Sequence, residues 1–265
     1  MSHIIHNARI IRDGHTIESG WLHYDDHTIL AIGQGDAPQD IQADHIDADG
    51  HTLMAGFIDV HVHGGASVDT MDADPTALHT MAKFFAQNGV TGFLATTWTD
   101  SRERVYAAMR AVKDAQQTSW HDGATLLGVH MEGPYLNIER AGAQNPDHIR
   151  RAAEDEMQLL FDLDVIKLLS LAPEFEENHW LIDACAKRGI ITSIAHSSAT
   201  YDQALAAFER GMSHSTHTYN AMTPLHHRKP GIVGAVMQSP HVMAELIADN
   251  IHVHPAAMNT LYRIK

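Results

Sequence analysis

From about residue 53 the chain alternates short apolar runs with helical patterns, and this rhythm constrains the fold more than any other feature. The helical segments carry their own boundaries, as where Asp74 and Pro75 open one and Gly89 ends it. The pattern predicts βα units with a parallel sheet, an α/β fold. Seven candidate strands cover residues 53–63, 91–98, 124–133, 165–174, 189–197, 211–220 and 242–250.

Seven strands with intervening helices are typical of a (β/α)₈ TIM-type barrel, and we expect this one to stop before strand 8. A doubly wound open sheet is the alternative, but no Gly-rich fingerprint follows its first strand. The first 52 residues differ, because they alternate apolar and polar residues in short pieces broken by Gly, Asp and Asn. We therefore predict a small N-terminal β domain over residues 1–52, part of a β-sandwich, and a barrel over residues 53–265.

Charge and composition exclude several classes of partner. The net charge is -15 with neutral histidine, so nucleic acid and anionic membranes would be repelled. No apolar run approaches the length of a membrane span, and the N-terminus lacks the apolar core of a signal peptide. A single cysteine, Cys185, fits a reducing compartment. We expect a cytoplasmic protein that acts on a small molecule.

The stretch "GFIDVHVHGG" places two histidines at the end of the first predicted barrel strand. Alternate side chains of a strand share a face, so His61 and His63 point the same way. In a βα barrel the chemistry lies at the carboxyl ends of the strands. These ends carry imidazoles and carboxylates, which are ligands that suit Zn²⁺ or Fe²⁺: His61, His63, His130, Glu132, Glu174, His196 and His217.

Each of these residues also has an ordinary structural interpretation, because the chain contains 22 histidines. We favour packing or ligand support for His130, and a loop cap for Glu174. Asp59 lies deeper in the strand than His61, and we expect it to orient a ligand imidazole. His214 and His217 differ by three positions, so only one points inward, and His217 is nearer the strand end.

Beyond the sixth and seventh strands lies the densest basic patch of this acidic chain, in "LHHRKPG" and "DNIHVHP". Barrels often hold phosphate at this place. Taken with the strand-end motifs, these segments resemble the N-acetylglucosamine-6-phosphate deacetylases of the amidohydrolase superfamily. The resemblance runs from about residue 50 to the end, in the order and spacing of "GFIDVHVHGG", "HMEGPYLN", "LAPE", "AHSSAT", "THTYNAM", "HHRKPGIVGA" and "LIADNIHVHP". The N-acetylgalactosamine-6-phosphate deacetylases share nearly all these motifs.

The resemblance implies a metal-dependent hydrolysis of the acetamide of N-acetylglucosamine 6-phosphate to glucosamine 6-phosphate and acetate, in a homodimer. It implies that Glu132, His196 and His217 bind a principal metal, Zn or Fe. His61 and His63 would bind a second metal, with Glu132 bridging. It also implies five contacts with the sugar phosphate, from Gln144, Asn220, Ala221, Arg228 and His252.

Two departures from the family pattern matter. The family's general acid/base is an aspartate on strand 8, and we expect its counterpart after residue 265, in a longer native chain. Gln144 stands where the family usually has histidine. Three alternatives therefore stay open: an N-acetylgalactosamine-6-phosphate deacetylase, an amidohydrolase with another amide substrate, and a truncated metal-binding remnant without activity.

Overall fold

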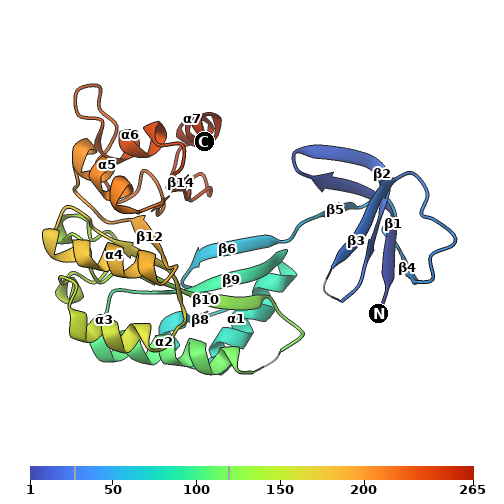
Figure 1. The fold of residues 1–265 in the computed structure, drawn as a ribbon, viewed down its shortest axis with the longest axis horizontal. Helices are drawn as coiled ribbons and strands as arrows, with labels where there is room; N and C mark the ends of the chain where they lie inside the picture. Colours follow the sequence, from blue (N-terminus) through green and yellow to red (C-terminus); the bar gives the residue numbers. More distant parts are fainter. Residues whose placement is uncertain (27, 119) are drawn as a thin grey trace. The chain divides into compact units, whose positions relative to one another are not determined.

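The computed structural model describes residues 1–26, 28–118 and 120–265. The chain divides into two compact units, Met1–Phe57 and Ile58–Lys265, which are described separately. The sequence placed a domain boundary after residue 52, so the first unit extends a few residues beyond it. Figure 1 follows the chain through both units from blue to red.

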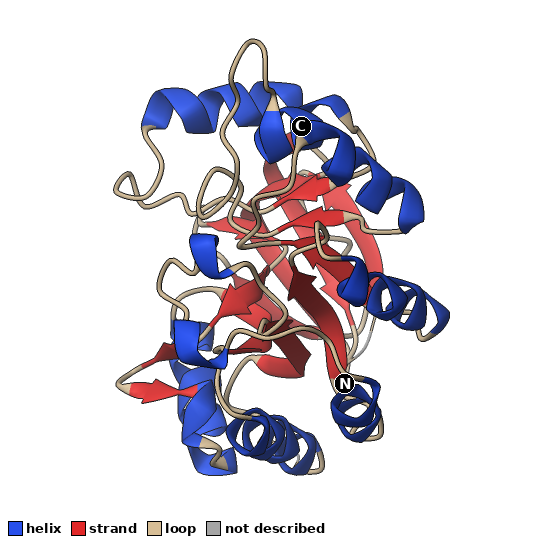
Figure 2. Cartoon of the chain, turned by 90° about the vertical axis from the view of Figure 1, so that its left-hand side faces the viewer, coloured by secondary structure: helices blue, strands red, loops and turns tan. Residues whose placement is uncertain are grey.

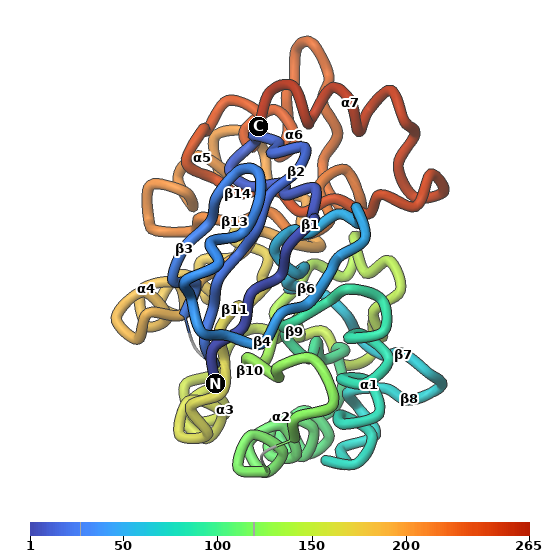
Figure 3. The backbone as a smooth tube through the Cα atoms, turned by 90° about the vertical axis from the view of Figure 1, so that its right-hand side faces the viewer, coloured from blue at the N-terminus to red at the C-terminus, as the bar shows by residue number. Residues whose placement is uncertain are grey.

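The first unit is built on one five-stranded sheet, in which β1 is central. It pairs antiparallel with β2 and parallel with both β4 and β5, while β2 pairs antiparallel with β3. In Figure 3, β1, β2 and β3 run side by side. Asp13 and Gly14 join β1 to β2 with φ of 48° and 73°, which a tight two-residue hairpin turn requires. The strands are β1 (His3–Arg12), β2 (His15–Tyr24), β3 (Ile29–Gln34), β4 (Asp44–Asp47) and β5 (Thr52–Met54).

The apolar run over residues 53–63 was predicted as one barrel strand, and the structure divides it between the two sheets. Its first part is β5, which pairs with β1 from Arg9↔Thr52 to Ile11↔Met54. Its second part is β6 (Phe57–Val62), which joins the other sheet. The prediction of a single strand was wrong because both parts are equally apolar, and only the pairing partner distinguishes them.

The second unit contains a seven-stranded sheet whose strands follow one another in chain order. Each pair from β9 to β14 is parallel, as βα units predict. The sheet curls, and Figure 2 shows its strands at the centre with helices outside them. The predicted sixth and seventh strands are only two residues long. Besides β6, the strands are β9 (Val90–Thr97), β10 (Thr125–Glu132), β11 (Ile166–Leu171), β12 (Ile191–Ile194), β13 (His214–Ser215) and β14 (Met243–Ala244).

The helix that Asp74 and Pro75 were predicted to open begins where the sequence placed it. Asp74 accepts a hydrogen bond from the N–H of Thr76 at the start of α1, and Thr200 forms a capping box with Gln203 at the start of α5. Among the described residues, no helix has the length and apolar character needed to cross a membrane. The helices are α1 (Pro75–Gln87), α2 (Arg102–Gln116), α3 (Glu154–Phe161), α4 (His179–Lys187), α5 (Tyr201–Arg210), α6 (Gly231–Gln238) and α7 (Pro255–Ile264).

The hydrophobic core of the second unit lies between the sheet and these helices. On α1 the buried face includes Leu78, Met81 and Phe85, at the spacing of successive helical turns. The ring of Phe85 meets that of Phe93 on β9 at a centroid distance of 5.0 Å. The core therefore fixes the outer face of the sheet against the helices, while the carboxyl ends of the strands are free to carry polar side chains.

Candidate metal centre

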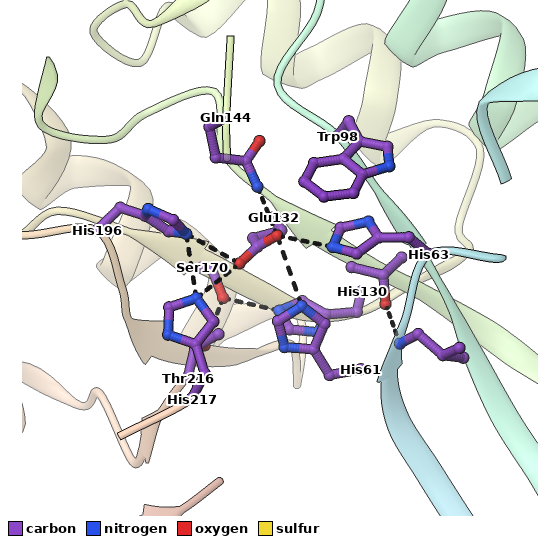
Figure 4. A network of polar contacts seen from close by, with 12 residues as sticks. His61, His63, Trp98, His130, Glu132, Gln144, Ser170, His196, Thr216 and His217 are labelled. Atoms are coloured by element: carbon purple, nitrogen blue, oxygen red, sulfur yellow. Dashed lines mark hydrogen bonds and ion pairs between the residues drawn. The ribbon is translucent and has the colours of Figure 1, made fainter. Parts of the chain in front are cut away.

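Four imidazoles converge on the carboxylate of Glu132, which is the last residue of β10 and is 1% exposed. Its Oε1 lies 3.2 Å from Nε2 of His196 and 3.1 Å from Nε2 of His217. Its Oε2 lies 3.1 Å from Nε2 of His63 and 3.5 Å from Nε2 of His61. Figure 4 shows the four rings around the carboxylate. The structure thus brings together all five residues that the sequence predicted as metal ligands.

The strand ends position these side chains. His61 and His63 alternate with Val62 at the end of β6, and the N–H of Val62 donates to Oγ1 of Thr96 on β9, at 2.9 Å. His196 and His217 follow β12 and β13 by two residues and adopt φ of 42° and 33°. A positive φ is strained for residues other than glycine, and such strain concentrates at functional sites. The turned backbone aims both rings at Glu132.

The distance between the two imidazoles on the Oε1 side fits a shared cation. Nε2 of His196 and Nε2 of His217 lie 3.1 Å apart. Two nitrogens bound tetrahedrally to one Zn²⁺ lie roughly 3.3 Å apart, since each Zn–N bond is about 2.0–2.1 Å. Nδ1 of His196 donates to the carbonyl oxygen of Arg140 at 2.8 Å, so Nε2 is the nitrogen that would offer a lone pair to a cation at the centre.

The candidate ligand atoms form two groups that share Glu132: one with His196 and His217, the other with His61 and His63. Within each group the atoms lie within 4.8 Å of one another. Imidazole nitrogens and a carboxylate are donors that Zn²⁺ and Fe²⁺ both accept. The residues therefore fit two cations bridged by one carboxylate.

The electrostatics of the centre are dominated by opposite charges close together. Burial raises the pKa of Glu132, but hydrogen bonds from four histidines outweigh it and hold the pKa well below its usual range. Burial lowers the pKa of His61, yet hydrogen bonds to Glu132 and Glu245 outweigh this effect and raise it to about 10. Without a cation, His61 therefore carries a proton at neutral pH. A bound cation would replace that positive charge.

Gln144 was expected to contact the substrate, and the structure places it against Glu132. Its Nε2 donates to Oε2 of Glu132 at 2.6 Å, and its Oε1 accepts from the N–H of Thr99 at 2.7 Å. The side chain is buried. Gln144 thus links the carboxylate to the backbone that follows β9, and a contact with the substrate stays a prediction.

His130 supports the floor of the centre. Its Nδ1 donates to the carbonyl oxygen of Val60 at 2.9 Å, and its Nε2 lies 2.7 Å from Oγ of Ser170. Burial, assisted by the neighbouring His61, lowers the pKa of His130 to about 4, so the ring is neutral. Both nitrogens are engaged, so a role in packing or support agrees with the geometry better than ligation.

Two further carboxylates that the sequence singled out, Asp59 and Glu174, accept hydrogen bonds from the segments that carry the candidate ligands. Oδ1 of Asp59 accepts from the backbone N–H of His61 at 3.0 Å, so it contacts the main chain of this candidate ligand. That it orients the imidazole stays a prediction. Glu174 accepts from the side chains of Asn137 and Ser197 and from the N–H of Ser198. It therefore ties together the loops beside His196, as a loop cap would.

Sequence reasoning missed two residues at the centre. Oε2 of Glu245 lies 3.1 Å from Nδ1 of His61. Glu245 falls inside the predicted strand over residues 242–250, whereas the structure ends β14 at Ala244, so the sequence did not mark Glu245 as a strand-end residue. The indole of Trp98 stacks on His63 with centroids 3.6 Å apart and planes at 14°, and its Nε1 donates to Asp69. No spacing rule in the sequence indicates this stacking.

Four further residues were predicted to contact the substrate. Nδ2 of Asn220 donates to the carbonyl oxygen of His217 at 3.3 Å, and Ala221 has a φ of 51°. Arg228 and His252 are exposed, and Nδ1 of His252 pairs with Oδ2 of Asp249 at 2.6 Å. Among the described residues, no hydrogen bond or ion pair joins the side chain of Arg228 or His252 to Glu132. Their contacts with a sugar phosphate stay predictions.

The chain is similar to characterised proteins over its whole length. It is 37% identical to the N-acetylglucosamine-6-phosphate deacetylase of Lysinibacillus sphaericus, covering 100% of this chain and 68% of the relative. It is also 37% identical to the N-acetylgalactosamine-6-phosphate deacetylase of Escherichia coli O157:H7, covering 98% of this chain and 67% of the relative.

The solved structures agree. The N-acetylglucosamine-6-phosphate deacetylase of Pasteurella multocida superposes with a TM-score of 0.92 at 32% identity, covering 100% of this chain and 69% of that one. The enzyme from Mycobacterium smegmatis in complex with N-acetyl-D-glucosamine-6-phosphate gives 0.90 at 26% identity, covering 99% and 68%. The curled sheet is thus a half-barrel of the TIM type. Since the amidohydrolase family model matches residues 52–265, the chain belongs to the amidohydrolase family.

Proposed function

We propose that this chain hydrolyses the acetamide of N-acetylglucosamine 6-phosphate to glucosamine 6-phosphate and acetate, in a metal-dependent reaction. The observation that carries the proposal is the meeting of His196, His217 and Glu132, whose three ligand atoms lie 3.1–3.2 Å apart. The relatives named as deacetylases of this sugar phosphate support the substrate.

The centre would hold Zn²⁺ or Fe²⁺. Glu132, His196 and His217 would bind one cation, and His61 and His63 would bind a second with Glu132 bridging. When bound, the cation supplies Lewis-acid chemistry: it polarises the amide carbonyl and acidifies a water molecule. The protein's own contribution is to hold the donors in place and to give the buried carboxylate of Glu132 its charge.

The substrate would lie above the centre, between the loops that follow β12, β13 and β14. Asn220 and the amide of Ala221 would donate hydrogen bonds to the sugar phosphate, and Arg228 and His252 would supply positive charge. Expulsion of the amine needs a proton, so the reaction also requires a general acid within hydrogen-bond reach. We further propose that the protein is a homodimer located in the cytoplasm.

The experiment measures metal content and ligand binding, which do not depend on that general acid. The chain is loaded with Zn²⁺, desalted and analysed for its metal-to-protein ratio, and sugar binding is measured by titration calorimetry. We expect bound zinc, and tighter binding of N-acetylglucosamine 6-phosphate than of N-acetylglucosamine or N-acetylgalactosamine 6-phosphate. Arg228→Ala should weaken binding of the phosphorylated sugar and leave the metal ratio unchanged.

Three results would count against the proposal. A chain that retains no metal contradicts the metal centre. Equal binding of the phosphorylated and unphosphorylated sugars contradicts the assigned phosphate contacts. Tighter binding of N-acetylgalactosamine 6-phosphate would instead indicate an N-acetylgalactosamine-6-phosphate deacetylase, like the Escherichia coli relative.

A further inference from the structure

A carboxylate that the proposed function leaves unassigned lies directly behind one of the imidazoles. Glu245 follows β14, the last strand of the seven-stranded sheet. Its N–H donates to the carbonyl oxygen of Ser215 at 2.9 Å, and its own carbonyl oxygen accepts from the N–H of Thr218 at 2.8 Å. The main chain of Glu245 is therefore fixed to the segment that also carries His217.

The side chain of Glu245 contacts a residue on the opposite edge strand of the sheet. His61 lies on β6, at the opposite edge from β14, and Oε2 of Glu245 lies 3.1 Å from its Nδ1. The carboxylate is 13% exposed, and its other oxygen is buried without a hydrogen-bond partner among the described residues. The contact with His61 is therefore the polar interaction that holds this carboxylate.

The two nitrogens of His61 face two different carboxylates. Nδ1 faces Glu245, and Nε2 faces Oε2 of Glu132 at 3.5 Å. An ionised carboxylate only accepts hydrogen bonds, so the nitrogen that faces Glu245 must carry the proton. When a cation binds beside Glu132 in place of the proton on Nε2, Nε2 is the nitrogen left to offer it a lone pair. This is the order carboxylate, imidazole, metal, which fixes both the tautomer and the orientation of a ligand ring.

The other candidate ligands lack such a carboxylate. Nδ1 of His196 donates to a backbone carbonyl, whereas Nδ1 of His63 and Nδ1 of His217 have no partner among the described residues. His130, His61 and Glu245 also lie close enough together to suggest a third cation. Both nitrogens of His130 are already engaged, so this trio is better explained as support for His61 than as a separate site.

We propose that Glu245 is a positioning residue that holds His61 in the Nδ1–H tautomer, so that Nε2 can bind the cation shared with His63 and Glu132. The inference rests on the proposed function, because it concerns the second of the two proposed cations. It assigns Glu245 a role that does not involve contact with the cation.

The test compares three variants of the chain. Glu245→Leu removes the acceptor, and Glu245→Gln keeps an oxygen of similar geometry without the charge. Asp59→Asn is the matched control, because Asp59 also contacts His61 but only through its backbone N–H. Zinc binding is measured at both sites by competition with a chromophoric chelator. The His61 tautomer in the zinc-loaded chain is read from the ¹⁵N shifts of labelled histidine.

We expect Glu245→Leu to weaken the second zinc by about 10- to 100-fold, the usual cost of losing such a partner, and to leave the first zinc within about twofold. The Nδ1–H signal of His61 should be lost or split between tautomers. Glu245→Gln should fall between wild type and Glu245→Leu, and Asp59→Asn should stay near wild type.

An unchanged second zinc in Glu245→Leu overturns the inference, and so does an equal loss at both sites, which would indicate a general effect on folding. Thermal melting of each variant identifies that case independently. A wild-type chain that binds one zinc and the sugar phosphate overturns the inference but leaves the proposed function in place. A wild-type chain that binds neither overturns the proposed function itself.

Discussion

The two sides of Glu132 are built differently. On the Oε1 side, His196 and His217 have side chains only 6% and 9% exposed, and both contact the carboxylate at 3.1–3.2 Å. On the Oε2 side, His61 and His63 are 17% and 19% exposed, with distances of 3.5 and 3.1 Å. The first side is enclosed, whereas the second is more open and depends on surrounding side chains for its geometry.

These surrounding side chains are specific to the open side. Gln144 donates to Oε2 of Glu132, Glu245 faces Nδ1 of His61, and Trp98 stacks on His63. The two proposed cations would therefore depend on different parts of the structure for their binding geometry. The first depends on strand ends and backbone turns, and the second depends on individual side chains that a substitution can remove.

The largest expected effect comes from Glu132, which both sides share. Glu132→Ala should lower the zinc-to-protein ratio of the loaded chain to near zero, because it removes the bridging carboxylate and leaves four imidazoles close together. The measurement is elemental analysis after desalting. A ratio like that of wild type would show that the carboxylate is not a ligand to either cation.

A double substitution on the open side separates the two cations. His61→Ala/His63→Ala should lower the wild-type ratio by about one zinc per chain, because His196, His217 and Glu132 keep their geometry. The same elemental analysis, with circular dichroism as the control for folding, measures this. If the variant and wild type retain the same ratio, the idea of two sites fails.

Gln144→Leu should have a smaller effect, confined to the open side. The substitution removes the 2.6 Å hydrogen bond to Glu132 and leaves the N–H of Thr99 without its acceptor. We expect a loss of about tenfold in affinity for the second zinc, as for other residues that orient a metal ligand. Chelator competition reports it, and a loss confined to the first zinc would contradict the assignment of Gln144 to the open side.

The smallest expected effect is a change with pH in the thermal stability of the metal-free chain. The pKa of His61 rises from 6.5 to about 10 on folding, because its bonds to Glu132 and Glu245 outweigh burial. A raised pKa adds stability that is complete below pH 6.5 and is lost as the pH rises toward 10. The melting temperature of wild type minus that of His61→Gln should therefore fall between pH 6.5 and pH 10.

Scanning calorimetry in a chelator measures this difference. A loss of 1 kcal/mol lowers the melting temperature of a chain of this size by about 2–4 °C, so a fall of several degrees is expected. A difference that is constant across the range would mean that His61 is not held protonated between its two carboxylates.

Much of this architecture was predictable from the sequence. The alternation of apolar runs and capped helices indicated the order of the sheet, and motifs at strand ends indicated Glu132 and the four histidines around it. Each motif is local, since it is recognised by spacing within one segment, although the ligand set follows from several motifs together. A residue such as Asp74 before Pro75 marks a helix start wherever the helix finally packs.

What the sequence did not indicate depends on pairing between distant segments. β5 belongs to the first sheet because it pairs with β1. Glu245 lies beside His61 because the seven-stranded sheet curls and brings its two edge strands together. The role of Gln144 follows from the position of Thr99, which lies 45 residues away along the chain. Periodicity and motif spacing contain no information about such contacts.

The metal centre joins segments that are far apart along the chain. Its contacts span 64 residues from Glu132 to His196, 85 to His217, and 184 from His61 to Glu245. Contacts of such high contact order form only after long loops have closed, which is slow and entropically costly. A cation bound there would therefore not nucleate folding as zinc does in a short finger. It would enter a scaffold that has already assembled, and its loading would be a maturation step that follows folding.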